Sequence, residues 1–184
     1  RTDTAQPGTG SSPEALTRAA SLQTYVTIRF LVDRGRARQA FQAYAYFRWV
    51  DDRIDEGTGS PAERAAFLRQ QRMLLDAGYR GRMPGDLCPE ERLSAELIAG
   101  DVEPDSGLRA YLDNMMTVMT FDLERRGRLI SAAELERYTD LLAAGVSEAL
   151  FHFIGHDTPP PLEGRATAVR GAHIIHMLRD LIED

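Results

Sequence analysis

The sequence predicts an all-α protein that forms a single domain. Signals for helix starts recur along the chain, and two segments, Ser60–Glu63 and Ser131–Glu134, match the capping box, in which the Ser and Glu side chains satisfy free helix amides. The alternation of apolar and polar residues that marks a half-buried strand is essentially absent, and no internal repeat is visible. With 184 residues, of which 43% are hydrophobic and 27% charged, the chain is long enough to bury a substantial core.

The expected elements follow from these signals in order. Residues 1–10 are rich in Gly, Pro and Thr and predict a flexible tail, which leaves residues 11–184 for the domain. Ser12 before Pro13 is typical of an N-cap and a first helical position, and Asp33-Arg-Gly35 interrupts the pattern that follows. Helices are expected over residues 13–32, 36–56, 61–78, 90–99, 105–126 and 132–154, with a last helix over 162–184 after the stiff Thr158–Pro161 loop.

Composition and charge exclude several classes of protein. The net charge is −6 and no long basic run occurs, which argues against a nucleic-acid partner. The single cysteine, Cys88, excludes an intrachain disulfide and fits a reducing compartment. No apolar stretch reaches membrane-spanning length and no signal peptide opens the chain, so we expect a cytoplasmic protein, either free or peripheral to a membrane. The chain lacks an initiator Met and stops at Asp184 inside a predicted helix; we expect a fragment, truncated at the C-terminus and also at the N-terminus.

Two pairs of aspartates carry most of the functional information. Asp51 and Asp55 lie in one predicted helix, and Asp180 and Asp184 lie in another, with a spacing of four residues in each case. Residues four apart share a helix face, so each pair presents two carboxylates side by side. Carboxylate oxygens are the ligands that Mg²⁺ prefers, and Mg²⁺ often completes its shell with substrate phosphates. Two such helices facing each other predict a magnesium diphosphate clamp.

Each pair belongs to a longer polar stripe that is flanked by apolar residues. The first stripe consists of Tyr44, Arg48, Asp51 and Asp55, and the second of His173, His176, Asp180 and Asp184. Spacings of three and four residues place each set on one helix face. The alternative is that both are ordinary solvated faces, in which Arg48–Asp52 and Arg179–Glu183 form ion pairs one turn apart. The matching geometry of the two stripes favours the clamp.

Four segments together resemble the motifs of one enzyme family. Arg48–Asp55 has the pattern RxxDDxxD, and Leu178–Asp184 has the pattern LRDxxED. Met116–Val146 is similar to the family's central stretch, and Ser21–Tyr25 stands where the family has a Ser-x-Ser-Phe turn. In this order over residues 15–184, the segments resemble the squalene/phytoene synthase family. Its members are all-α enzymes of the class I isoprenoid synthase type that join two prenyl diphosphates head to head. The resemblance implies the same fold here, in a divergent member that is incomplete at its C-terminus.

The resemblance also implies roles for individual residues. The metal ligands for Mg²⁺, or for Mn²⁺ in its place, would be Asp51, Asp55, His176, Asp180 and Asp184. The groups on diphosphate oxygens would be Ser21, Thr24, Tyr44, Arg48, His173 and Arg179. Tyr138 would line the pocket near the departing diphosphate and would share the catalytic role with Tyr44 and Arg48. Cations would neutralise the charge on the leaving group, and a dry apolar wall would shield the carbocation. Candidates for this wall, for each of which plain core packing is the alternative, are Phe41, Phe47, Met115, Met119, Leu142, Val146 and Leu150.

The sequence departs from the family pattern at several positions. His173 and His176 stand where the family usually has Gln and Asn. Imidazole suits Zn²⁺, Mn²⁺ or Fe better than Mg²⁺, and it also donates hydrogen bonds and serves as an acid or base near neutral pH. The Ser-x-Ser-Phe turn is loosened, and the central Gly-x-Val-Gly reads Ala144-Gly-Val-Ser147. The fold and the diphosphate chemistry are therefore better supported than the product.

We expect a prenyltransferase of isoprenoid biosynthesis, on the way to terpenoids or carotenoids, with farnesyl or geranylgeranyl diphosphate as the substrate. It would join two prenyl units head to head or transfer one to a different acceptor. One alternative is a non-catalytic relative that keeps the fold for assembly or binding, and another is a helical-bundle metalloprotein. The four retained aspartates argue against the first, and the interior helices lack the Glu-x-x-His motif of the second. Prenyl chain length, NADPH use and oligomeric state do not follow from the sequence.

Overall fold

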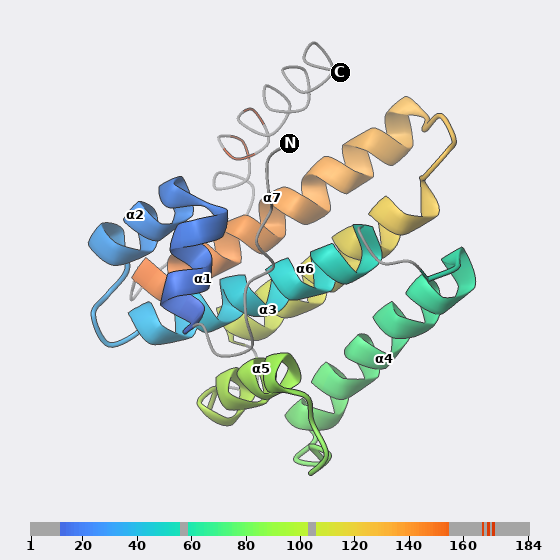
Figure 1. Cartoon of the computed structure of the whole chain (residues 1–184). Helices are drawn as coiled ribbons and strands as arrows, with labels where there is room; N and C mark the ends of the chain where they lie inside the picture. Colours follow the sequence, from blue (N-terminus) through green and yellow to red (C-terminus); the bar gives the residue numbers. More distant parts are fainter. Residues whose placement is uncertain are drawn as a thin grey trace, which may run out of the picture.

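The computed structural model describes residues 12–55, 59–102 and 106–154, and the isolated positions 167, 169 and 171. Over this part of the chain it is built from helices and contains no strand, which confirms the predicted fold class. The helices are α1 (Pro13–Ala20), α2 (Leu22–Leu31), α3 (Ala37–Asp55), α4 (Pro61–Tyr79), α5 (Pro89–Ala99), α6 (Gly107–Glu124) and α7 (Ala132–Ile154) (Figure 1). The predicted tail over 1–10 and the predicted last helix over 162–184 fall outside the residues that the structure describes.

The first expected helix is divided in two at Ser21. This residue has extended backbone (φ −152°, ψ 101°), and its amide donates to the Thr17 carbonyl at 2.8 Å, which ends α1. Its hydroxyl accepts the Thr24 amide at 3.2 Å and caps α2. Serine is a preferred N-cap because its short side chain replaces a missing helical acceptor. The prediction of one helix over 13–32 was therefore wrong at this residue.

Both predicted capping boxes are confirmed. At the start of α4, the Ser60 amide donates to the Glu63 carboxylate at 2.7 Å and the Glu63 amide donates to the Ser60 hydroxyl at 3.3 Å. At the start of α7, the equivalent distances between Ser131 and Glu134 are 2.8 and 3.2 Å. In each case two amides that the helix leaves without partners are satisfied reciprocally.

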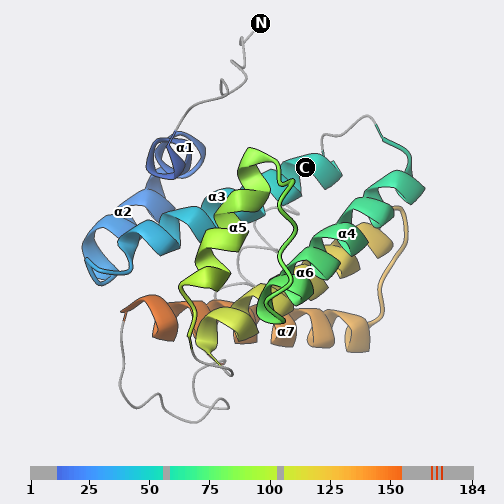
Figure 2. The same cartoon turned by 90° about the horizontal axis from the view of Figure 1, so that it is seen from below.

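Helix α3 occupies the centre of the bundle, where it packs against α1, α2, α4, α5 and α6 (Figures 1 and 2). Its inward face is apolar, and Tyr46, Val50 and Ile54 are at most 1% exposed. The core around them is completed by buried residues of the other helices, among them Leu68, Leu75, Leu97, Leu108, Leu112 and Met116. Burial of this face provides the main stabilisation of α3 and fixes which side of the helix points outward.

A buried polar network also fixes the rotation of α3. The Tyr46 hydroxyl donates to Gln71 Oε1 at 3.2 Å, and Gln71 Nε2 donates to Glu91 Oε1 at 2.9 Å. The network joins α3, α4 and α5. Burial raises the pKa of Tyr46, so its hydroxyl keeps the proton that it donates. A satisfied buried network of this kind specifies one arrangement of the helices.

Helices α6 and α7 run antiparallel and lie against each other along their length (Figure 2). The rings of Phe121 and Tyr138 are 5.2 Å apart at one end of the pair. Further along, a Cβ atom on Gly145 would lie 3.2 Å from the Asn114 Cβ, so the glycine allows the close approach. This pairing carries Tyr138 to the C-terminal end of α6. None of the described helices combines the length and the apolar character that a membrane crossing requires.

Candidate active site

The first polar stripe lies on the outward side of α3. Tyr44, Arg48 and Asp51 are half-buried and Asp55 is exposed, whereas Val50 and Ile54 on the inward side are buried. The guanidinium of Arg48 lies 2.6 Å from the Asp52 carboxylate and 3.7 Å from that of Asp51. The ion pair between Arg48 and Asp52 that the solvated-face alternative predicts is therefore present. Because these side chains are about 40% exposed, it contributes little to stability and leaves Arg48 available to another anion.

Asp51 is an acid of the stripe whose pKa is shifted by its surroundings. Burial raises its pKa, Arg48 opposes the rise, and the charges of Asp52 and Asp122 raise it further. Asp122 lies in α6, so the packing of α6 against α3 brings a carboxylate from a second helix towards the pair. A group of like charges that is partly removed from water favours a bound cation. The carboxylates of Asp51 and Asp122 thus both contribute negative charge to this part of the described structure.

Asp122 connects this group to Tyr138. The Tyr138 hydroxyl donates to one oxygen of Asp122 at 3.2 Å, and Arg125 Nε donates to the other oxygen at 2.6 Å. Tyr138 is 8% exposed, and burial, followed by the charge of Asp122, raises its pKa. The phenol therefore remains protonated at neutral pH and acts as a hydrogen-bond donor. The charge of Asp51 also raises the pKa of Tyr138.

The α1–α2 junction reaches the other end of the stripe. The hydroxyl oxygens of Ser21 and Thr24 are 2.9 Å apart. Burial raises the pKa of Tyr44, while Arg48 and a hydrogen bond with Ser21 oppose the rise. Of the predicted diphosphate contacts, Ser21 thus interacts with Tyr44, and Thr24 lies beside Ser21. The extended backbone at Ser21 turns the chain between α1 and α2, and its hydroxyl interacts with Tyr44 of α3.

The sequence interpretation missed Asp122, Arg125 and Arg126. The last of these follows α6 and reaches α3, where it donates to the Ile54 carbonyl at 2.8 Å and forms an ion pair with Asp55. All three residues stand inside the central stretch that resembles the family, so the signal was present but no role had been assigned. The missing information was spatial, because Arg126 and Asp55 are 71 residues apart.

The second stripe lies outside the described residues. Its four members, His173, His176, Asp180 and Asp184, are not described, and neither is Arg179, so the convergence of the two acid pairs remains a prediction. In the described part of the chain, no group of three or more His, Cys, Asp or Glu side chains is placed to hold one metal ion. The donors that the first stripe does offer are carboxylate oxygens, which suit Mg²⁺ better than a softer metal.

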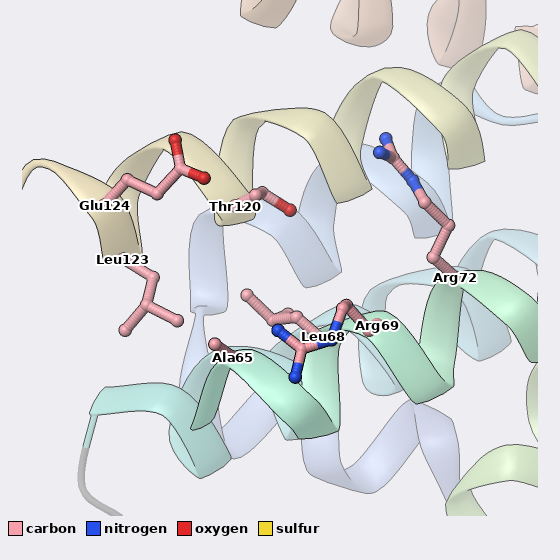
Figure 3. Close-up of a pocket in the computed structure, with 7 residues that line it drawn as sticks. All are labelled: Ala65, Leu68, Arg69, Arg72, Thr120, Leu123 and Glu124. Atoms are coloured by element: carbon pink, nitrogen blue, oxygen red, sulfur yellow. The ribbon is translucent and has the colours of Figure 1, made fainter. Parts of the chain in front are cut away.

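The residues proposed for an apolar wall differ in their burial. Phe41, Phe47 and Met119 are buried at 5–6% exposure inside the core, where plain packing explains them. Leu150 is 40% exposed. A separate groove of about 180 Å³ lies between α4 and α6 (Figure 3). It shares no residue with the two stripes and is lined by Ala65, Leu68, Arg69, Arg72, Thr120, Leu123 and Glu124.

Comparison with known families agrees with the motifs. The model of the squalene/phytoene synthase family matches residues 17–184, which include α2 to α7 and both aspartate motifs. No curated protein and no solved structure shows significant similarity to the chain. The family match extends over most of the sequence, and the all-helical structure has the fold type of that family. The chain belongs to the squalene/phytoene synthase family.

Proposed function

We propose that the protein is a prenyltransferase that ionises Mg²⁺-bound allylic prenyl diphosphates and joins two prenyl units head to head or passes one to another acceptor. The family match supports prenyl transfer in general. The observation that carries the proposal further is the arrangement around Asp51. Half-buried Asp51 and Asp52 on α3 lie beside Arg48, and the charge of Asp51 acts on Tyr138 of α7, which is hydrogen-bonded to Asp122 of α6. This combination suits the diphosphate end of such a substrate.

Some residues of the chain would bind the metal ions, and others would donate hydrogen bonds to the diphosphate. Mg²⁺, held by Asp51, Asp55, Asp180 and Asp184 with His176, would supply positive charge to the diphosphate. Arg48 is exposed enough to exchange Asp52 for a diphosphate oxygen, and Ser21, Thr24 and Tyr44 offer hydroxyl donors beside it. As the allylic C–O bond breaks, its electron pair goes to the diphosphate. Preorganised donors at that oxygen stabilise the developing charge.

Tyr138 is a donor whose protonation state and hydrogen-bond partner are both given by the structure. Its phenol is protonated, and Asp122 fixes its orientation while Arg125 fixes Asp122. We infer that Tyr138 faces the departing diphosphate as a neutral donor, and that its single O–H proton turns from Asp122 to a diphosphate oxygen when the substrate is bound. Asp122 therefore acts through Tyr138 and is a positioning residue. The substrate class is farnesyl or geranylgeranyl diphosphate, which the protein would meet in the cytoplasm or at a membrane surface.

The test is a product assay with the full-length protein. Labelled farnesyl or geranylgeranyl diphosphate is incubated with Mg²⁺, with and without NADPH, and the extracted products are identified by mass spectrometry. We expect a metal-dependent prenyl product, which Asp51→Asn and Asp55→Asn abolish and which Asp86→Asn, in the exposed loop before α5, leaves unchanged. If the protein forms no prenyl product and releases no diphosphate under any of these conditions, the non-catalytic alternative is favoured.

A further inference from the structure

Arg126 holds the end of α3 from a distant part of the chain. It lies in the turn after α6, which Gly127 continues with a positive φ of 73°. One guanidinium nitrogen donates to the Ile54 carbonyl at 2.8 Å, and the other forms an ion pair with the Asp55 carboxylate. The Ile54 carbonyl is in the last turn of α3, where the helix offers it no internal partner. A guanidinium at this position satisfies the carbonyl and opposes the negative end of the helix dipole.

The ion pair between Arg126 and Asp55 is exposed enough for a metal ion to replace Arg126. Arg126 is 37% exposed and Asp55 is 51% exposed, and an ion pair in such surroundings contributes only about 0–1 kcal/mol. The contact is strong enough to hold Asp55 in one place but too weak to compete with a divalent ion that has several oxygen ligands. In the metal-free protein, the positive charge beside Asp55 is therefore supplied by the Arg126 guanidinium.

The other charges around the acid pair have different partners. On α3, Arg48 contacts Asp51 and Asp52. On α6 and its C-cap, Asp122 is paired with Arg125. Arg126 is thus the guanidinium assigned to Asp55, and it also lowers the pKa of Asp51 through its charge. A divalent ion at Asp51 and Asp55 would meet Arg126 as a neighbouring like charge.

We propose that Arg126 is a diphosphate-binding residue that is held on Asp55 until the metal arrives. This inference rests on the proposed function. When Mg²⁺ takes the Asp55 carboxylate, the guanidinium is displaced and its planar fork binds diphosphate oxygens, which it matches geometrically. Metal alone then has to displace Arg126 without giving it a new partner, whereas metal with diphosphate supplies one. The two ligands consequently bind with positive coupling, and Arg126 is the source of part of that coupling.

The test is a titration of the full-length protein with Mn²⁺, followed by the electron paramagnetic resonance signal of the free ion, with and without inorganic pyrophosphate. Without pyrophosphate, Arg126→Gln should bind Mn²⁺ about 3- to 10-fold more tightly than the wild type, because the competing cation is gone. With pyrophosphate, the gain in Mn²⁺ affinity should be roughly tenfold smaller in the variant than in the wild type, because the bidentate partner is lost.

Two further variants make the experiment specific. Arg126→Lys keeps the charge but not the fork, so it should bind Mn²⁺ alone like the wild type and recover only part of the coupling. Arg128→Gln, two residues along in the same turn, removes a guanidinium that pairs with Glu134 and should match the wild type in both titrations. Circular dichroism establishes that each variant is folded. If Arg126→Gln does not fold, the partial coupling of Arg126→Lys still decides the matter.

The outcomes separate this inference from the proposed function. Unchanged or weaker Mn²⁺ binding by Arg126→Gln without pyrophosphate, or an unchanged effect of pyrophosphate, overturns the role of Arg126 and leaves the clamp intact. A wild-type protein that binds no Mn²⁺ even with pyrophosphate overturns the proposed function and, with it, the role of Arg126.

Discussion

The Tyr138 hydroxyl donates to Asp122 at 3.2 Å, and a matched pair exists elsewhere in the fold, where the Tyr79 hydroxyl donates to Asp101 at 2.8 Å. In both tyrosines burial is the main cause of a raised pKa, so both remain protonated. They differ in position, since Tyr79 ends α4 whereas Tyr138 lies in α7, where the charge of Asp51 acts on it. At the scale of single residues, this comparison separates a donor in the candidate site from an equivalent donor that serves structure.

We expect Tyr138→Phe to lower kcat by about 10²- to 10³-fold, the scale on which loss of one preorganised donor acts. Tyr79→Phe should change kcat by less than about twofold, since it lies outside the site and loses only one ordinary hydrogen bond. Steady-state kinetics of both variants, with melting curves as a check on folding, measure the difference. An equal loss of activity in the two variants would show that Tyr138 has no role beyond packing.

The role of His173 and His176 in catalysis is a second prediction at the scale of single residues. They lie outside the described residues, and their spacing of one turn beside the second acid pair is known from the sequence. We predict that the double change His173→Gln with His176→Asn lowers the rate by roughly a hundredfold or more, the scale of a lost general acid or base. It should also remove an activity transition near pH 6–7, where an imidazole of ordinary pKa titrates. Unchanged kinetics and an unchanged pH profile would indicate an ordinary mechanism that needs Mg²⁺ alone.

At the scale of elements, α4 and α7 both begin with a capping box, at Ser60 and Ser131, but the residues around the two boxes differ. The Glu63 pKa is lowered by hydrogen bonds from Ser60. The Glu134 pKa is lowered to about 2, with a hydrogen bond from Arg128 as the largest cause and the bonds from Ser131 next. The start of α7 therefore depends on a contact with the preceding turn, in addition to its own cap.

A depressed acid pKa stabilises the fold above the unfolded pKa and loses that effect as the pH falls through the folded pKa. For Glu134 the unfolded value is 4.5 and the folded value about 2, so the stabilisation should be complete at neutral pH and should decline between these values. Glu134→Gln is expected to lower the Tm at pH 7 more than Glu63→Gln does, because only the former also loses an arginine partner. Thermal melts across this pH range provide the measurement; equal Tm changes for the two variants at pH 7 would exclude the contribution of Arg128.

At the scale of the whole molecule, the central question is whether the two acid pairs hold the same ions. A ligand at 100 times its Kd adds about 2.7 kcal/mol, which for a domain of this size corresponds to roughly 5–10 °C in Tm. We expect a shift of this order when Mg²⁺ and pyrophosphate are added together to the full-length protein. Asp51→Asn and Asp180→Asn should each remove most of it, and Asp86→Asn should not. A shift that survives Asp180→Asn would show that the second pair binds elsewhere.

Much of the fold could be predicted from the sequence because the relevant forces act locally. Capping boxes and helix breaks involve residues three or four apart, and their positions in the structure agree with those expected at Ser60 and Ser131. The error at Ser21 has the same origin: an N-cap serine inside an otherwise helical pattern was read as part of the helix. The alignment of Arg48, Asp51 and Asp55 on one helix face also followed from their spacing, whereas the family followed from the resemblance of the motifs to known ones.

The partners of that helix face were decided only by the tertiary structure. The charge of Asp122 acts on Asp51 because α6 packs on α3, and Arg126 contacts Asp55 across 71 residues of sequence. Helical periodicity specifies which side chains share a face, but it contains no information on which distant helix covers that face. That choice depends on how the apolar surfaces of α3, α6 and α7 fit together, because burial is non-directional and only the packed arrangement selects one set of neighbours.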